Sequence, residues 1–201
     1  MHVMKFLLYI LIPLSEAFIS LTKHFSRGLH QTRSLARFNE SNAGPGHCES
    51  KWTYFNETNA CYKNFFWSTF NAAESLCKTV GGHLTSIHSF EENSFVAEMS
   101  KSGNRLTDSA QATWIGLVRS DYLNSNWNSS LTVKWVWTDG TKVDFLAWAP
   151  NKPNAKGSER CALLYSDPHA NSAYALWYEK WNGFTCIPNL RSFVCKKMAL
   201  H

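Results

Sequence analysis

Short aromatic runs separated by polar turns dominate the chain from residue 48 onward and predict a series of brief strands. Two of these runs, Trp52–Phe55 and Cys61–Phe66, flank a short polar segment, so we expect them to form a β-hairpin. Val133–Trp137 and Lys142–Phe145 flank Asp139-Gly140, a dipeptide that favours a tight turn, and predict a second hairpin. Further runs that predict strands are Ala112–Val118, Cys161–Tyr165 and Arg191–Lys197.

Two segments have the spacing of apolar positions that predicts an amphipathic helix. The first, Ser68–Val80, has Ser68 as its expected N-cap and ends at Gly81-Gly82. The second, Ser89–Lys101, has Ser89 as its expected N-cap and Glu92 three residues on, the arrangement of a capping box. Two helices followed by short strands and long loops indicate an α+β domain. The apolar helix positions are Phe70, Ala73, Leu76, Cys77 and Val80, then Phe95, Val96 and Met99.

Residues 1–17 have the features of a secretory signal peptide. Lys5 supplies a positive charge, an apolar run follows from Phe6 to Leu14, and Ala17 ends a small-residue cleavage site. The apolar run is about nine residues long, whereas a helix that spans a bilayer needs about 20. No later segment is apolar for long enough either. We therefore expect a secreted, extracellular protein with no membrane span.

Residues 18–46 form a basic, Ser-rich segment that ends at Gly44-Pro45-Gly46. We interpret it as a flexible stalk or a processed pro-segment, and the alternative is a patch for glycosaminoglycans or anionic surfaces. Most of the net charge of +5 lies in this segment. The remainder, residues 47–198, is the expected domain and has no basic stripe of the kind that nucleic-acid binding needs. We therefore expect no nucleic-acid partner.

Six cysteines in an exported chain predict three disulfide bonds. Their spacing is too wide for a zinc site, and the sequence alone leaves the pairing open. Three sequons, at Asn39, Asn56 and Asn128, suit an exported glycoprotein. The cysteines are Cys48, Cys61, Cys77, Cys161, Cys186 and Cys195.

Catalytic motifs are absent from the sequence. It contains no Gly-x-Ser-x-Gly elbow, phosphate-binding loop or His-Glu-x-x-His pattern. His83 and His88 flank an apolar segment, which favours structural roles for both. We therefore expect a binding protein and no enzyme.

The order of several motifs resembles that of C-type lectin-like domains. Trp114-Ile115-Gly116-Leu117 follows the two predicted helices, and the Trp-rich segment 135–141 comes after it. His83–His88 with Glu91-Glu92-Asn93, and later Trp181-Asn182, also match the family in order. The resemblance covers about residues 48–198 and implies an α+β fold with a long ligand-binding loop region. Further matching positions are Phe145, Trp148, Cys161, Cys186 and Cys195.

The resemblance also implies one disulfide pairing. It joins Cys77 to Cys195 and Cys161 to Cys186, with Cys48–Cys61 as the additional bridge of the long form of the family. The Cys77–Cys195 bridge would close most of the domain into a loop, which is worth roughly 4–5 kcal/mol in the chain-entropy model. The family's fold would also allow Glu91 to pair with Lys196 or Lys197.

In sugar-binding members of the family, calcium is held by a Glu-Pro-Asn or Gln-Pro-Asp loop, a later Glu and a Trp-Asn-Asp. The matching positions here are Lys152, Asn154, Glu159, Asn182 and Gly183. An ammonium at Lys152 repels a dication by several kcal/mol, and Gly183 has no side-chain oxygen. We therefore expect no cofactor and weak or absent calcium binding. Lys152 either takes the place of the cation beside Glu159 or is an exposed loop lysine without a role. Arg160 and Ala155 also disfavour auxiliary calcium sites.

The tryptophans suggest where a ligand could stack. Trp127, Trp177 and Trp181 lie in polar sequence, although core packing is the favoured interpretation for each. The candidate ligand site comprises Lys152, Asn154, Glu159, Trp181 and Asn182. We expect an extracellular glycan or glycoprotein as the partner, with little or no calcium dependence. The alternative is a protein partner bound without sugar or calcium. The tryptophans expected in the core are Trp114, Trp135, Trp137 and Trp148.

Overall fold

The computed structural model describes residues 46–123, 133–154 and 157–201. The expected signal peptide, the extension up to residue 45, Asn39, Trp127, Asn128 and Ala155 lie outside these residues. Within them, no helix is both long and apolar enough to cross a membrane. The elements are β1 (Thr53–Phe55), η2 (Asn56–Thr58), β2 (Ala60–Ser68), α2 (Phe70–Thr79), β3 (His83–Leu84), α3 (Phe90–Ser100), η3 (Ser109–Gln111), β4 (Thr113–Arg119), α4 (Ser120–Leu123), β5 (Trp135–Trp137), β6 (Cys161–Leu164), η4 (Ser172–Trp177), β7 (Trp181–Phe184) and β8 (Leu190–Met198).

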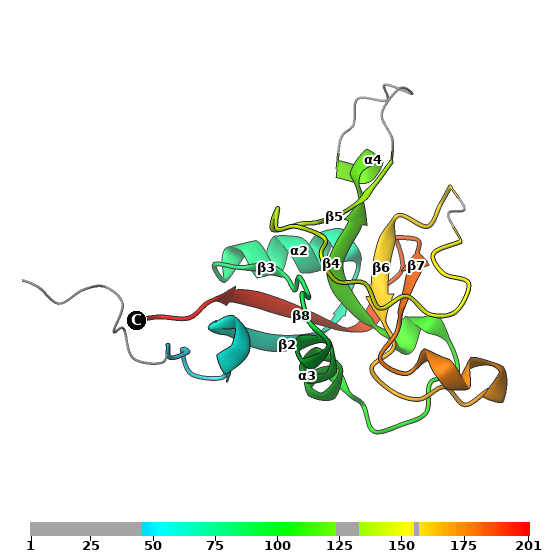
Figure 1. The fold of residues 1–201 in the computed structure, drawn as a ribbon, viewed down its shortest axis with the longest axis horizontal. Coiled ribbons are helices and arrows are strands. Elements are labelled where there is room, and N and C mark those ends of the chain that lie inside the picture. Colours follow the sequence, from blue (N-terminus) through cyan, green and yellow to red (C-terminus); the bar gives the residue numbers. More distant parts are fainter. Residues whose placement is uncertain (1–45, 124–132, 155–156) are drawn as a thin grey trace, which may run out of the picture. The chain divides into compact units, whose positions relative to one another are not determined.

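One mixed sheet organises the domain, and with the helices it confirms the α+β fold class. Its strands run in the order β1-β2-β8-β4-β6-β7, with β3 paired to β8 and β5 paired to β4. The long central pair β2 and β8 is antiparallel from Ala60↔Met198 to Ser68↔Leu190, while β4 runs parallel to β8. In Figure 1, β3 and the C-terminal end of β8 lie at the left of the domain, and β6 and β7 lie at the right. The predicted first hairpin is confirmed as β1 and β2, with Tyr54 opposite Cys61.

Helix α2 begins one residue later than the sequence suggested. Thr69, not Ser68, is the N-cap, and its hydroxyl accepts a hydrogen bond from the amide of Ala72 at 3.3 Å. Ser68 is unavailable as a cap because it is the last residue of β2 and pairs with Leu190. The helix buries Phe70, Ala73 and Cys77 on one face, which packs against β4 and β8.

Helix α3 confirms Ser89 as an N-cap, since its hydroxyl accepts from the amide of Glu92 at 3.0 Å. The reciprocal half of the predicted capping box is wrong. The fully buried Glu92 carboxylate instead accepts from the amide of His88 (2.8 Å), the hydroxyl of Tyr62 (2.6 Å) and the ammonium of Lys196 (2.6 Å). Burial and the nearby Glu92 raise the pKa of Tyr62 well above its ordinary value.

The ion pairing of the last strand also differs from the prediction. Lys196 pairs with Glu92 rather than with the exposed Glu91, and Lys197 pairs with Glu49 at 2.9 Å. The helical periodicity explains the first difference, because Glu92 lies on the face of α3 that is buried in the core.

The predicted second hairpin is wrong. A turn does form at Asp139-Gly140, where the amide of Gly140 donates to the carbonyl of Trp137 at 3.1 Å. However, β5 pairs with β4, and within the described range 133–154 no strand forms at Lys142–Phe145. Phe145 instead packs its ring against that of Trp181, with 5.7 Å between centroids. Side-chain packing, rather than a strand ladder, therefore fixes the chain after this turn.

Three disulfide bonds confirm the pairing that the resemblance implied: Cys48–Cys61, Cys77–Cys195 and Cys161–Cys186. The second joins α2 to the last strand, across 118 positions of the sequence. The third joins the start of β6 to the segment before β8. The core contains Trp114 and Trp137 as expected, whereas Trp135 and Trp148 are only partly buried and contact each other.

Candidate functional site

The long loop between β5 and β6 is held by β7 at two points. Near its middle, the amide of Ala149 donates to the carbonyl of Trp181 at 2.8 Å. At its end, the amide of Arg160 donates to the carbonyl of Phe184 at 3.1 Å. The loop contains a cis peptide bond between Lys152 and Pro153. The backbone of β7 therefore places the loop residues next to Asn182 and Gly183.

Lys152, Asn154 and Glu159 form a chain of polar contacts, as their expected roles in one site require. With its amide nitrogen directed towards Glu159, Asn154 donates to the Glu159 carboxylate at 2.5 Å. The amide oxygen of Asn154 then accepts from the Lys152 ammonium at 3.3 Å. The same ammonium lies over the ring of Trp177, 5.5 Å from its centroid, in a cation–π contact. Lys152 is thus bound within the loop and is not a free surface lysine.

Asn182 lies next to this chain on β7 and is only 6% exposed. Its amide nitrogen donates to the hydroxyl of Tyr165 at 3.1 Å. Its amide oxygen is buried and has no hydrogen-bond partner among the described residues. A buried acceptor without a partner costs about 1–3 kcal/mol, so this oxygen is suited to a donor from a ligand or water.

Tyr165 and Trp177 connect Asn182 to Lys152. Their rings lie 5.2 Å apart, and Trp177 also contacts Tyr174 at 4.4 Å. Burial raises the pKa of Tyr165, so its hydroxyl stays protonated and can hydrogen-bond as a neutral group. From the sequence, Trp177 was expected only as a possible stacking surface, and no pattern marked Tyr165 as a site residue.

Calcium, which the family resemblance implies, does not fit these residues. The oxygen of Asn154 accepts from the Lys152 ammonium, so a cation of the protein itself already lies at this ligand position. At Gly183, a Cβ atom would lie 3.3 Å from a carboxylate oxygen of Glu159, but the glycine supplies no side-chain oxygen. Glu159 is therefore the single carboxylate of the set, whereas calcium prefers six to eight oxygen ligands with several carboxylates.

Trp181 does not present its ring to a ligand, contrary to its place in the predicted ligand site. It is fully buried, and its indole nitrogen donates to the side-chain oxygen of Asn93 at 2.7 Å. Alternation along β7 explains the difference, because Trp181 faces the core while its neighbour Asn182 faces the opposite side. Trp181 supports the site as part of its hydrophobic floor.

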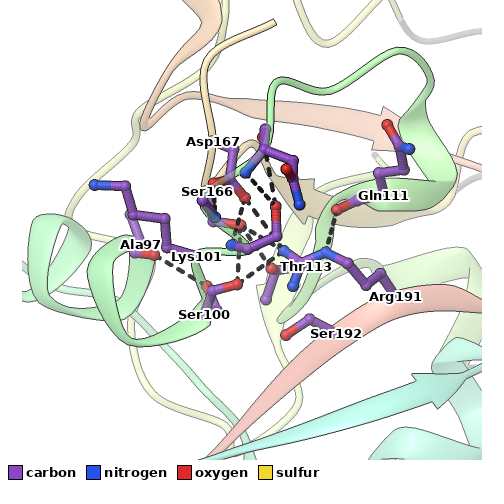
Figure 2. Close-up of polar contacts among 12 residues, drawn as sticks. Ala97, Ser100, Lys101, Gln111, Thr113, Ser166, Asp167, Arg191 and Ser192 are labelled. Atoms are coloured by element: carbon purple, nitrogen blue, oxygen red, sulfur yellow. Dashed lines mark hydrogen bonds and ion pairs between the residues drawn. The ribbon is translucent and has the colours of Figure 1, made fainter.

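An ion pair between the buried Asp167 and the partly buried Arg191 lies close to the end of β6 (Figure 2). Asp167 is 1% exposed, and its oxygens accept from the amides of Ser102 (2.8 Å) and Gly103 (2.9 Å). The guanidinium of Arg191 lies 3.4 Å from Asp167 and also donates to the carbonyl of Gln111 at 2.9 Å. Burial lowers the pKa of Arg191, although Asp167 acts in the opposite direction.

The same guanidinium joins the end of α3 to the segment after β6. It donates to the carbonyl of Ser100 at 2.8 Å and to the hydroxyl of Ser166 at 3.2 Å, and the Ser166 hydroxyl is 3.0 Å from that of Thr113 (Figure 2). From the sequence, Arg191 was expected only as the start of a strand. The charges of Asp167 and Arg191 next to buried runs were the available signal, and they do not identify the two residues as partners.

The two histidines expected to be structural both pair with carboxylates. His83 Nδ1 lies 2.7 Å from Glu74, and His88 Nδ1 lies 2.7 Å from Asp144. Of the three sequons, Asn56 is described and is exposed in η2. The other two lie outside the described residues.

Known proteins that are similar to this chain share its fold, but their names describe different ligands. A family model described as the Lectin C-type domain matches residues 67–197. An alpha-N-acetylgalactosamine-specific lectin of Patiria pectinifera is 33% identical over 150 residues, which cover 72% of this chain and 77% of that protein. A type-2 ice-structuring protein of Brachyopsis segaliensis is 30% identical over 155 residues, or 76% of this chain and 74% of that protein.

A solved structure described as a calcium-independent type II antifreeze protein has a TM-score of 0.57 to this chain at 26% identity. The match covers 79% of this chain and all of that one. The names of these proteins describe different ligands, so the ligand of this chain must be argued from its own residues.

Proposed function

Because this chain belongs to the C-type lectin domain family, we propose that it is an extracellular, non-enzymatic binding module that recognises glycans through its long loop without calcium. The chain of contacts from Lys152 through Asn154 to Glu159 carries this proposal. It supplies a fixed ammonium next to hydrogen-bond acceptors, which is an arrangement that can bind hydroxyl groups directly.

The ammonium of Lys152 acts as the cation of the site. Its contacts, an amide oxygen and the face of Trp177, are both neutral. At about 4 Å and an effective dielectric constant near 20, a calcium ion would be repelled by several kcal/mol. The lysine could leave this position only by losing both contacts.

The polar atoms that remain match a sugar. The Glu159 carboxylate accepts from hydroxyl groups, and the Lys152 ammonium donates to them. The partly exposed indole of Trp177 adds an apolar surface beside them. The similarity to an alpha-N-acetylgalactosamine-specific lectin supports glycans as the ligand class.

A protein partner is the second candidate. Leu176, next to Trp177 in η4, is 74% exposed, and an exposed apolar residue beside an aromatic one suits a protein interface. A glycan array separates the two candidates. Binding that free sugar blocks favours the glycan, and silence on the array with a specific protein partner favours the second.

Calcium titration by calorimetry, with thermal melts at matching concentrations, tests the mechanism. We expect no heat of binding and an unchanged melting temperature for the natural protein, and array binding that EDTA leaves unchanged. The double variant Lys152→Glu, Gly183→Asp restores two carboxylates and should gain both signals. Lys142→Glu makes the charge change of the first of these substitutions at an exposed loop position and should not gain them. Calcium-dependent stabilisation of the natural protein would contradict the proposal.

A further inference from the structure

A cavity of about 500 Å³ lies at the start of the long loop, and neither Lys152, Asn154 nor Glu159 lines it. It is bounded by β3, the turn at Asp139–Thr141 and the C-terminal end of β8, which Figure 1 shows at the opposite side of the domain from β6 and β7. This volume lies within the range of sites that bind small molecules. The lining residues are Thr58, Gly81, Gly82, His83, Ser86, His88, Asp139, Thr141, Lys196, Lys197 and Met198.

Basic groups dominate the charged wall of this cavity. Two lysines and two histidines line it, against the single carboxylate of Asp139. The acidic partners of the four basic groups are not among the lining residues. These partners are Glu92 for Lys196, Glu49 for Lys197, Glu74 for His83 and Asp144 for His88.

Asp139 is already engaged by neutral donors. Its oxygens accept from the hydroxyl of Ser86 (2.5 Å) and from the amide (2.9 Å) and hydroxyl (2.6 Å) of Thr141. Burial alone would raise the pKa of Asp139, but these hydrogen bonds outweigh it and hold the pKa below its ordinary value. The carboxylate is therefore satisfied within the protein and does not need a cationic ligand.

The Nε2 nitrogen of His83 is available to a ligand. Its Nδ1 is fixed by Glu74 at 2.7 Å, and its Nε2 has no hydrogen-bond partner among the residues that the structure describes. The side chain is 36% exposed and lines the cavity. A ring that is oriented by a carboxylate at one nitrogen presents the other nitrogen in a fixed direction.

We propose that this cavity binds a single sulfate or carboxylate group carried by a molecule of sugar size. Lys197 and the protonated form of His83 supply positive charge for the anion. In that form the Nδ1–H of His83 donates to Glu74, and its Nε2–H donates to the anion. The stems of Lys196 and Lys197 and the side chain of Met198 supply apolar surface for the carrier. This site is separate from the contacts among Lys152, Asn154 and Glu159 and does not depend on the function proposed above.

Galactose 6-sulfate, galactose and sodium sulfate are suitable probes, with binding to the whole protein followed by amide chemical shifts. We expect galactose 6-sulfate to bind at least about tenfold more tightly than galactose and to shift the amides of Gly81, Gly82 and Thr141. The amides of Lys152 and Asn154 should stay unchanged. Equal affinity for sodium sulfate would support the same anion chemistry and assign it to the free ion.

Two substitutions of His83 test the role of Nε2. His83→Asn retains a donor at the position of Nδ1, facing Glu74, and removes Nε2, so we expect about fivefold weaker binding with an unchanged melting temperature. His83→Gln retains a donor near the position of Nε2 and should bind more tightly than His83→Asn. Lys134→Gln, at an exposed position outside the cavity wall, should bind as the natural protein does. The proposal is overturned if neither anion binds, if the shifts lie at Lys152 and Asn154, or if His83→Asn binds normally.

Discussion

The buried network around Arg191 and the long-loop site around Lys152 each contain one basic group and one carboxylate, but they satisfy them differently. Arg191 contacts Asp167 directly, and both groups make further hydrogen bonds to the protein. Lys152 reaches Glu159 only through the amide of Asn154, and the adjacent Asn182 keeps an oxygen without a partner among the described residues. The Arg191 network stabilises the packed body of the domain, which we call the frame. The Lys152 site leaves polar atoms for a ligand.

The chemistry of the two basic side chains suits this division. A guanidinium presents several donors in a rigid plane, so Arg191 can join three segments at once. An ammonium on a flexible stem loses more freedom when it is fixed and can turn its donors towards a new acceptor. Substituting Arg191 should therefore mainly change stability, and substituting Lys152 should mainly change ligand binding.

The largest effect should come from Arg191→Met. The substitution leaves Asp167 buried without its cation, so we expect the free energy of unfolding to fall by about 3–5 kcal/mol. Urea unfolding followed by tryptophan fluorescence measures it. In the double variant Arg191→Met, Asp167→Asn the buried charge is gone, and part of the loss should be recovered. A loss below about 1 kcal/mol in the single variant would show that the network does not support the frame.

Alkaline pH should have an intermediate effect, through the buried tyrosines. Unfolded tyrosine ionises near pH 10.0, whereas burial raises the pKa of folded Tyr165. Unfolding therefore releases a proton above pH 10, and stability that is complete below this pH is lost as the pH rises, by about 1.4 kcal/mol per pH unit and tyrosine.

Urea unfolding between pH 8 and 11 measures this loss, and Tyr165→Phe should reduce its slope. Tyr62, whose pKa is also raised by burial, should account for the pH dependence of stability that remains in that variant. A slope that Tyr165→Phe leaves unchanged would mean that the Tyr165 hydroxyl is not shielded in the folded protein.

The smallest effect on stability should come from Lys152→Met. The substitution keeps the stem and removes an ammonium whose contacts are both neutral, so we expect a change within about 0.5 kcal/mol. Affinity for an array-identified glycan should nevertheless fall by about tenfold or more. Lys142→Met, at an exposed position, should change neither quantity. A large loss of stability in Lys152→Met would place this lysine in the frame and not in the binding site.

The sequence allowed much of the frame to be predicted, because alternation and helical spacing report burial directly. The first hairpin, both helices and the α+β class followed from such patterns, and the resemblance supplied the disulfide pairing. The strand predicted at Lys142–Phe145 is wrong. Phe145 packs against Trp181, while the backbone of the segment pairs with no strand among the described residues. Local pattern does not report such tertiary choices.

The site was only partly accessible from sequence for a similar reason. The resemblance gave Lys152, Asn154, Glu159 and Asn182 as one group, and three of them are in direct contact. It also gave Trp181, whose ring is in the core. Tyr165 and the Arg191–Asp167 pair could not be found by spacing, because their partners lie on elements that are distant in sequence.

The pairing of the disulfides also determines how the domain carries mechanical force. His47 and Leu200 lie side by side, joined by two backbone hydrogen bonds of 2.9 Å each. If the chain is pulled at these two residues, the covalent path runs from Cys48 to Cys61, along β2 and α2 to Cys77, and across to Cys195. Everything between residues 78 and 194 is outside this path. The long loop would therefore bear no tension while both bridges are intact, so a ligand bound there could be held under a pull that unzips the end of β8.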